Sequence, residues 1–201
     1  MKAELAALIL AGGYSRRMGR DKAWVKWQGQ ALWQHVHQRL QGQHPTALRS
    51  VWINTREPSD AFVAAVADGL LEGRVQDAPD YAGMGPLAGM HAGLSQLDSQ
   101  WLLVVPCDTP LLPLDLLQRL QAAQAPVAIA ASRSGDHLRP HPTVALLHQS
   151  ALPGITSQLQ AQDLKLMHWL AKQTHAVVAW ADDQAFANVN DPTALSTLPG
   201  S

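Results

Sequence analysis

The chain has 201 residues, of which 47% are hydrophobic and 15% are charged, a composition typical of a folded globular protein and not of a disordered chain. Its formal net charge is -1, so no general electrostatic attraction to nucleic acid or to a membrane surface is expected. A single cysteine, Cys107, excludes an intramolecular disulfide and agrees with a reducing compartment. No apolar stretch is long enough to span a membrane, so we expect a cytoplasmic protein. The length of the chain predicts a single domain over residues 1–201.

The first apolar run, residues 5–11, has no polar interruption, which is typical of a strand buried on both faces of a parallel sheet. A loop rich in glycine and arginine follows it. Residues 24–30 then predict a short extended piece and a turn. Residues 31–41 predict a helix, because apolar side chains recur four residues apart along one of its faces.

Strand and helix patterns alternate from there through residue 131. In chain order they are a strand at 50–54, a helix at 58–67, a strand at 74–77, a helix at 86–97, a strand at 100–105, a helix at 114–123 and a strand at 126–131. Such alternation predicts a doubly wound parallel sheet with right-handed crossovers.

The order of elements becomes irregular after residue 131. It continues with a strand at 139–147, helices at 149–160 and 164–172, a strand at 176–180, a loop or short extended piece at 186–190 and a short helix from 192 to 195. This part predicts a β-hairpin-like addition with an antiparallel strand. The expected fold class is therefore α/β, a doubly wound three-layer sandwich with a mostly parallel, Rossmann-like central sheet.

Glycine or polar residues follow the apolar strands at four places. These places are residues 10–13, Asn54, Asp77 and residues 106–109. In an open parallel α/β sheet, ligands bind outside the carboxyl ends of the strands. The coincidence of the four positions therefore predicts a ligand site at this edge of the sheet.

The loop after the first strand begins with Gly12 and Gly13, which have no Cβ and so let the backbone approach a ligand closely. Arg16, Arg17 and Lys22 add full positive charges that suit phosphate oxygens. The loop contains neither G-x-x-x-x-G-K-[ST] nor G-x-G-x-x-G. It predicts an anion site, with a structural turn and solvated arginines as the alternative.

Asp108 lies at the tip of the most apolar strand, where a carboxylate beside phosphates can hold a divalent cation such as Mg²⁺. A helix N-cap or an Asx turn before Pro110 explains the same aspartate equally well. Asp77 is a candidate second metal ligand, base-reading acceptor or turn residue. The amide of Asn54 suits either a nucleobase edge or a turn.

Two later segments carry further candidates. Residues 83–89 combine glycines, among them Gly85 and Gly89, with a helix start, which suits close backbone approach to a ligand or plain packing of helix on sheet. Asn188 and Asn190 are two residues apart, so on an extended piece their amides point the same way and suit a substrate. They suit a closing turn equally well.

Together these motifs resemble a known family. Residues 10–22, Leu-Ala-Gly-Gly-Tyr-Ser-Arg-Arg-Met-Gly-Arg-Asp-Lys, resemble the loop L-A-G-G-x-S-x-R-M-G-x-D-K of molybdenum cofactor guanylyltransferases. Gly85-Pro-Leu-Ala-Gly89 resembles their second glycine element, and Pro106-Cys-Asp-Thr-Pro110 is similar to their metal-binding strand end. His141-Pro-Thr-Val-Ala145 and Asn188-Val-Asn190 resemble their pterin-side segments. The matches cover nearly the whole chain.

The resemblance implies an enzyme that joins GMP from GTP to the terminal phosphate of molybdenum-carrying molybdopterin, with Mg²⁺, and releases pyrophosphate. It implies a GTP-binding half over about residues 1–110 and a pterin-binding half over about residues 111–201. The implied nucleotide-binding residues are Leu10, Ala11, Gly12, Gly13, Lys22, Asn54, Asp77, Gly85 and Asp108. The implied catalytic residues are Arg17, Lys22 and Asp108, with Asp108 also the metal ligand. The implied pterin-side residues are Gly89, Asn188 and Asn190.

Three other functions stay open at this point. Molybdopterin cytidylyltransferases, which use CTP, tend to have Ala-Ala-Gly where this chain has Ala11-Gly12-Gly13, so the double glycine favours GTP. The segments at 106–110 and 188–190 argue against a sugar- or polyol-phosphate nucleotidyltransferase. Lys22 and Asp108 argue against a non-catalytic GTP- or pterin-binding chaperone.

The expected partners follow from the same resemblance. They are GTP, molybdopterin and the proteins that insert molybdenum or deliver the cofactor to molybdoenzymes. We expect a monomer that binds neither nucleic acid nor a membrane.

Overall fold

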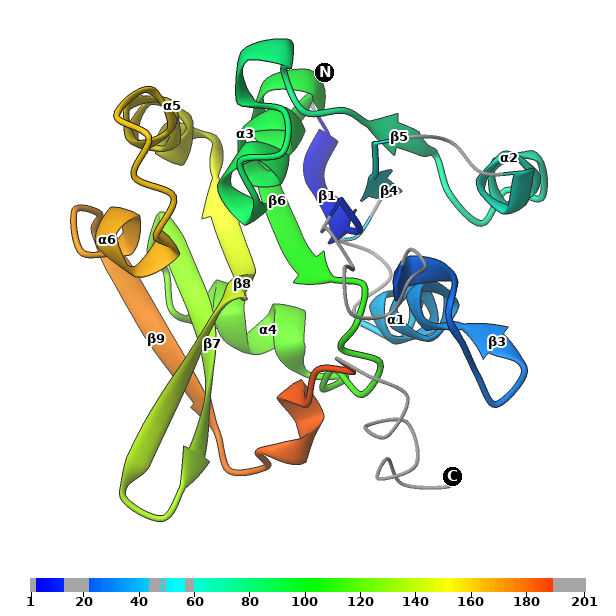
Figure 1. Ribbon diagram of the computed structural model, residues 1–201. Helices are drawn as coiled ribbons and strands as arrows, with labels where there is room; N and C mark the ends of the chain where they lie inside the picture. The colour runs from blue at the N-terminus through cyan, green and yellow to red at the C-terminus, as the bar shows by residue number, and fades with distance from the viewer. Residues whose placement is uncertain (1–2, 13–21, 44–47, 49, 57–59, 190–201) are drawn as a thin grey trace.

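The computed structural model describes residues 3–12, 22–43, 48, 50–56 and 60–189 (Figure 1). At its centre is a seven-stranded sheet with the strand order β5-β4-β1-β6-β8-β7-β9. These strands are β1 (Ala3–Leu10), β4 (Val51–Asn54), β5 (Gly73–Val75), β6 (Ser99–Pro106), β7 (Val127–Ser134), β8 (His137–His148) and β9 (His175–Trp180).

The sheet is parallel except for one strand. β5, β4, β1 and β6 pair in parallel, and so do β7 and β9. β8 runs antiparallel to both of its neighbours, β6 and β7. The prediction of a mostly parallel sheet with an antiparallel addition in the C-terminal half is therefore confirmed.

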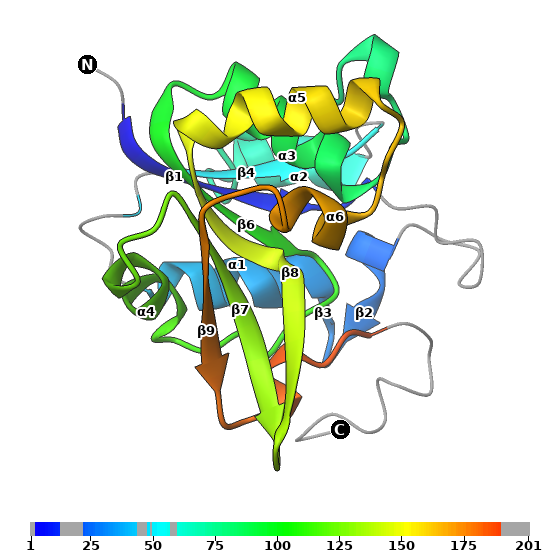
Figure 2. The same ribbon diagram turned by 90° about the vertical axis from the view of Figure 1, so that its left-hand side faces the viewer.

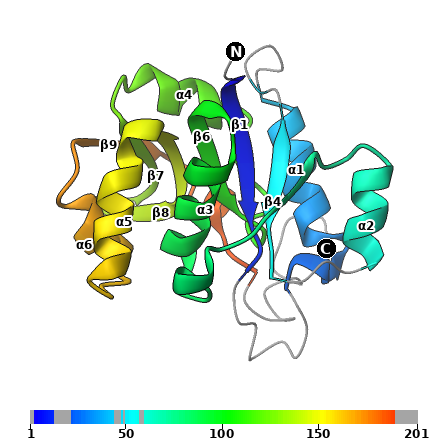
Figure 3. The same cartoon turned by 90° about the horizontal axis from the view of Figure 1, so that it is seen from above.

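Helices cover both faces of this sheet (Figures 2 and 3). α1 (Leu32–Gln41), α2 (Asp60–Ala67) and α4 (Leu116–Ala122) contribute buried side chains to one core cluster. α3 (Pro86–Gln96), α5 (Leu152–Gln160) and α6 (Leu166–Leu170) contribute to the other. The three predicted layers, helix, sheet and helix, are thus confirmed.

The burial of β1 explains its uninterrupted apolar sequence. Leu5, Ala7 and Ile9 belong to the core on one face, and Ala6 and Leu8 to the core on the other. Successive side chains of a strand point to opposite faces, so a central strand between two helix layers needs apolar residues at every position.

Short elements complete the described part of the chain. They are η1 (Lys22–Trp24), the hairpin of β2 (Lys26–Trp27) and β3 (Gln30–Ala31), η2 (Pro79–Tyr81), η3 (Gln149–Ala151) and η4 (Gln184–Phe186). The β2–β3 hairpin corresponds to the extended piece and turn predicted at 24–30. No helix among the described residues is long and apolar enough to cross a membrane.

Several predicted boundaries differ from the structure by one to three residues, those of β5 and α6 among them. β5 ends at Val75, so Asp77 lies in the following loop and not on the strand. α6 starts two residues later than predicted, because the Asp163 carboxylate accepts the Lys165 N–H at 3.3 Å and lies 3.0 Å from Nδ1 of His168, which holds a turn before the helix. The helix predicted from 192 to 195 lies outside the described residues.

Candidate active site

The carboxyl ends of three strands form one continuous edge. The register pairs Leu10 of β1 with Asn54 of β4 and with Pro106 of β6. Beyond the strands, the Ala11 N–H donates to the Asn54 carbonyl at 2.8 Å, and the Cys107 N–H donates to the Leu10 carbonyl at 3.0 Å. The predicted meeting of these strand ends is confirmed.

Asn54 connects two of the predicted site residues. Its side chain is buried, and its Nδ2 donates to the Val75 carbonyl at 3.2 Å and to Oδ1 of Asp77 at 2.9 Å. The other carboxylate oxygen of Asp77 accepts the Gly83 N–H at 3.3 Å. Through this amide nitrogen Asn54 holds the loop after β5 in place, while Asp77 stays half-buried beside it.

Glycines leave the room that this amide needs. A Cβ added at Gly12 would lie 3.3 Å from Oδ1 of Asn54, and one added at Gly89 would lie only 2.6 Å from the same atom. Gly85, which precedes α3, has a φ of 77°, a conformation that glycine adopts without strain. The observed place of Gly89 is against Asn54 and Leu10, and its contact with the pterin stays a prediction.

A hollow opens beside this pair. It has a volume of about 450 Å³ and is lined by Gly12, Asn54, Thr55, Arg56, Gln76, Asp77 and Ala82. That volume lies in the range of small-molecule sites. Three of the lining residues, Gly12, Asn54 and Asp77, were predicted as nucleotide-binding residues.

Sequence reasoning missed the other lining residues. Thr55 and Arg56 follow Asn54 directly, so their place after a parallel strand was the available signal. Arg56 is exposed, and its carbonyl accepts a hydrogen bond from Nη1 of Arg74 at 2.9 Å. Arg56 brings a positively charged residue to the lining of the hollow, which suits an anionic ligand.

A histidine on α3 lies close to the same hollow. Burial lowers the pKa of His91, and the negative charge of Asp77 opposes this shift. The ring packs edge-on against Tyr81, and its Nδ1 is buried without a hydrogen-bond partner in the described structure. Near neutral pH His91 therefore adds no positive charge to this side of the site.

Asp108 lies on the other side of the edge, next to the last described segment of the chain. The Val189 N–H donates to the Asp108 carbonyl at 2.8 Å, and the Thr109 hydroxyl donates to Oδ1 of Asn188 at 2.9 Å. Figure 1 shows this segment passing beside the loop that follows β6. The fold thus brings Asp108 and Asn188 together, although 80 positions separate them.

Asp108 offers one carboxylate that could hold a divalent cation. The carboxylate is half-buried at a strand end, and a hard oxygen ligand of this kind suits Mg²⁺. In the described part of the chain, no three His, Cys, Asp or Glu side chains gather as a metal site.

Several predicted residues fall outside what the structure describes. Gly13, Arg17 and Asn190 belong to this group, and only the backbone of Lys22 is described, in η1. Their assigned contacts stay predictions.

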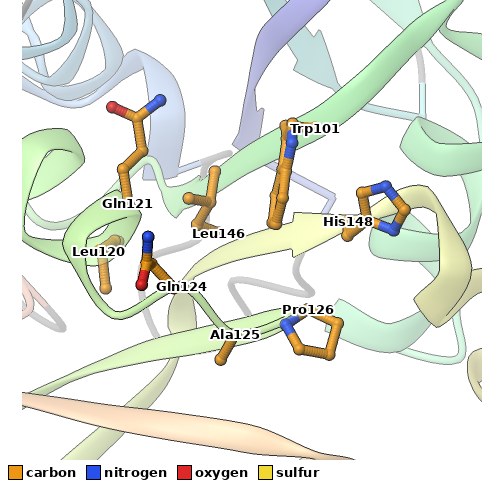
Figure 4. Close-up of a pocket in the computed structure, with 8 residues that line it drawn as sticks. All are labelled: Trp101, Leu120, Gln121, Gln124, Ala125, Pro126, Leu146 and His148. Atoms are coloured by element: carbon orange, nitrogen blue, oxygen red, sulfur yellow. The ribbon is translucent and has the colours of Figure 1, made fainter.

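A second hollow lies at the other end of the central strands, near the start of β6 and the end of β8. It has a volume of about 510 Å³ and is lined by Trp101, Leu120, Gln121, Gln124, Ala125, Pro126, Leu146 and His148. Figure 4 shows Trp101 between Leu146 and His148, with the glutamines on the α4 side. Its lining contains neither Lys nor Arg, so the first hollow is the better match for a nucleotide.

Comparison with known proteins agrees with this geometry. Residues 7–178 match the family model of the MobA-like NTP transferase domain. The chain is 38% identical to the molybdenum cofactor guanylyltransferase of Shewanella halifaxensis, over 96% of this chain and 92% of the relative, and 37% identical to that of Shewanella sp. MR-4, over 96% and 93%. The crystal structure of the molybdopterin-guanine dinucleotide biosynthesis protein A from Archaeoglobus fulgidus superposes with a TM-score of 0.71 at 21% identity, over 95% of each chain.

Proposed function

Because the chain belongs to the MobA-like NTP transferase family, we propose that it transfers GMP from GTP to molybdenum-carrying molybdopterin and releases pyrophosphate. Relatives that match it over nearly their full length carry the name molybdenum cofactor guanylyltransferase. The structural observation that carries the proposal is the bonded pair Asn54–Asp77. It borders a hollow at the same strand edge that holds Gly12 and Asp108.

The nucleoside of GTP lies in the hollow at the ends of β4 and β5. Asn54 and Asp77 offer amide and carboxylate oxygens there, and Arg56 offers a cation. The triphosphate then runs along residues 10–13 toward Asp108. The backbone N–H groups of Gly12 and Gly13 can approach it closely, because glycine has no Cβ. Arg17 and Lys22 neutralise its charge, and Gly85 contributes backbone at the start of α3.

The acceptor lies on the other side of Asp108. The nucleoside takes the side of β4 and β5, so the acceptor takes the side of β6 and β8, where Asn188 meets Thr109. The attacking oxygen of the acceptor lines up with the pyrophosphate oxygen that leaves the α-phosphorus. This arrangement assigns nucleotide binding mainly to about residues 1–110 and the pterin mainly to about residues 111–201. Asn190 is a further pterin contact, and Gly89 is one from the first half.

The reaction forms one bond and breaks another. An oxygen of the acceptor's terminal phosphate attacks the α-phosphorus of GTP, and the bond from that phosphorus to the oxygen bridging to the β-phosphate breaks. The nucleophile is already ionised near neutral pH, so no protein general base is required. The chain contributes orientation and charge neutralisation. Mg²⁺ held by Asp108 would supply further positive charge to the phosphates.

A nucleotide transfer assay tests the proposal. Purified protein is given molybdopterin and GTP, CTP or ATP labelled at the α-phosphate, with and without Mg²⁺. We expect transfer from GTP with Mg²⁺ and little from the other nucleotides. A preference for CTP would make the protein a cytidylyltransferase, and the absence of transfer from all three would favour the chaperone alternative.

The metal assignment is tested in the same assay with Asp108→Ala. We expect a loss of about a hundredfold or more in GTP turnover, because charge stabilisation of the transferring group is lost. Asp98→Ala is the matched control, since Asp98 is exposed and precedes the opposite end of β6. Wild-type turnover by Asp108→Ala would contradict the role of this carboxylate.

We also propose that the protein acts as a cytoplasmic monomer and receives or passes on the cofactor through proteins that insert molybdenum or serve molybdoenzymes. The mass of the protein in solution, measured by light scattering, tests the prediction that it is a monomer.

A further inference from the structure

Three polar side chains, two from the β7–β8 hairpin and one from the segment after β9, meet at one point. They are Ser132 on β7, His141 on β8 and Asp183, which precedes η4. The Ser132 hydroxyl donates to Oδ1 of Asp183, and its Oγ lies 2.9 Å from Nε2 of His141. A hydroxyl has only one hydrogen to donate, so His141 must be the donor to Ser132 through Nε2–H.

This order of contacts excludes a hydrolytic triad. Ser132 is fully buried, and its hydrogen points to the aspartate and not to the histidine. A serine nucleophile needs an accessible oxygen and a base that takes its proton. The three residues therefore form a clamp between the hairpin and the segment after β9.

Ring packing strengthens the same junction. The His141 ring stacks on Phe186 of η4, with ring centroids 4.7 Å apart and an interplanar angle of 16°. Phe186 is buried and also packs edge-on against Trp180, with centroids 5.4 Å apart. Residues 183–186 are thus held to the hairpin by hydrogen bonds and by an aromatic stack.

The far end of the same segment is anchored at the active-site edge. Asn188 and Val189 bond to Thr109 and Asp108, and the Val189 side chain is buried with Trp27. The segment 183–189 therefore spans from the hairpin clamp to the loop that carries Asp108.

We propose that Ser132, His141 and Asp183 are positioning residues for the acceptor substrate, which hold the segment 183–189 so that Asn188 faces the acceptor phosphate. This inference rests on the proposed function, since it takes Asn188 as the pterin-side contact. The clamp does not touch the nucleotide hollow, whose lining comes from the strand ends of β1, β4 and β5 and the loops after them. It therefore acts on the acceptor and not on GTP.

The charges around His141 agree with this role. Burial lowers the pKa of His141, the positive charge of Arg139 lowers it further, and the carboxylate of Asp183 opposes both effects. Arg139 lies on β8 opposite Ser132, and Asp183 faces from the segment before η4. The neutral ring is therefore favoured near neutral pH, and its Nε2–H donates to Ser132.

Steady-state kinetics of four variants test the proposal. We expect Ser132→Ala to raise the KM for molybdopterin about five- to tenfold, the scale of one or two lost hydrogen bonds, and to leave the KM for GTP within about twofold. His141→Gln keeps an N–H donor, and His141→Phe keeps an aromatic ring for the stack on Phe186. We expect the KM for molybdopterin of His141→Gln to stay closer to the wild-type value than that of His141→Phe. Leu138→Ala is the control, because Leu138 is exposed on the same hairpin and outside the clamp.

Amide hydrogen exchange without substrates gives a second readout. Ser132→Ala should speed exchange in residues 184–187 and leave β1 and β6 unchanged. Unchanged exchange and an unchanged KM for molybdopterin would overturn the inference, and so would equal increases in both KM values. If the wild type transfers no GMP to molybdopterin, the proposed function fails, while faster exchange in Ser132→Ala would still support the clamp.

Discussion

At the scale of single residues, Asn54 does the most to shape the edge of the sheet where we propose that the nucleotide binds. One amide nitrogen bonds to the Val75 carbonyl and to the Asp77 carboxylate, and the amide oxygen lies in a space kept open by two glycines. The amide therefore fixes both the loop after β5 and one wall of the hollow. An aspartate has nearly the same shape but no N–H group, which makes it a sharp test of this arrangement.

We predict that Asn54→Asp lowers the free energy of unfolding by about 2–4 kcal/mol near pH 8, because it places a carboxylate against the Val75 carbonyl and the Asp77 carboxylate. It should also raise the KM for GTP. Urea unfolding and transfer kinetics measure the two effects. The double variant Asn54→Asp with Asp77→Asn restores one donor between the side chains and should recover part of the stability. A stability equal to wild type in the single variant would contradict the observed contacts.

At the scale of elements, α3 has glycines where it approaches the sheet. Gly89 and Gly93 are four residues apart and so lie on one face of the helix. A Cβ at Gly89 would lie 2.6 Å from Oδ1 of Asn54, whereas one at Gly93 would lie 2.6 Å from Cδ2 of Leu102 and 2.7 Å from Cδ2 of Leu8. Gly89 therefore packs closely against a site residue, whereas Gly93 packs closely against core residues.

We predict that Gly89→Ala and Gly93→Ala both lower stability, because overpacking costs about 1–3 kcal/mol and the gain in helix propensity of about 1 kcal/mol offsets only part of it. Gly89→Ala alone should raise the KM for GTP, since it displaces the Asn54 amide. Thermal unfolding and GTP kinetics of the two variants separate packing from binding. Equal KM values for GTP in both variants would show that the Asn54 position does not depend on Gly89.

At the scale of the whole molecule, the fold was largely predictable because strand and helix periods are local signals. The apolar run of β1 and the residues at its carboxyl end predicted a central strand and a ligand edge. The position of β8 between β6 and β7 was not predictable, because a hydrophobic period marks a strand and not its neighbours. The bond between Asn54 and Asp77 and the clamp at Ser132 depend on tertiary proximity, which the spacing of these common residue types does not signal.

Three histidines distributed over the molecule give its stability a common pH dependence. Burial lowers the pKa values of His37, His91 and His141 below their ordinary value of 6.5, and contacts with the Leu70 backbone, Asp77 and Asp183 only partly oppose the shifts. His37 is buried on α1, His91 lies near Asp77 beside the nucleotide hollow, and His141 belongs to the clamp. Each is favoured in its neutral form by the folded protein.

We predict that the protein is less stable at about pH 5.5 than at about pH 7.5. The unfolded chain protonates these histidines as the pH falls through 6.5, before the folded chain does, so stability is complete above that value and is lost progressively toward the native pKa values. The lowered pKa of Asp163, caused mainly by its hydrogen bond to His168, acts only in more acidic solution. Urea unfolding at the two pH values measures the difference, and His37→Gln should reduce it by removing one of the three groups. Equal or greater stability at the lower pH would contradict the assignment of neutral buried histidines.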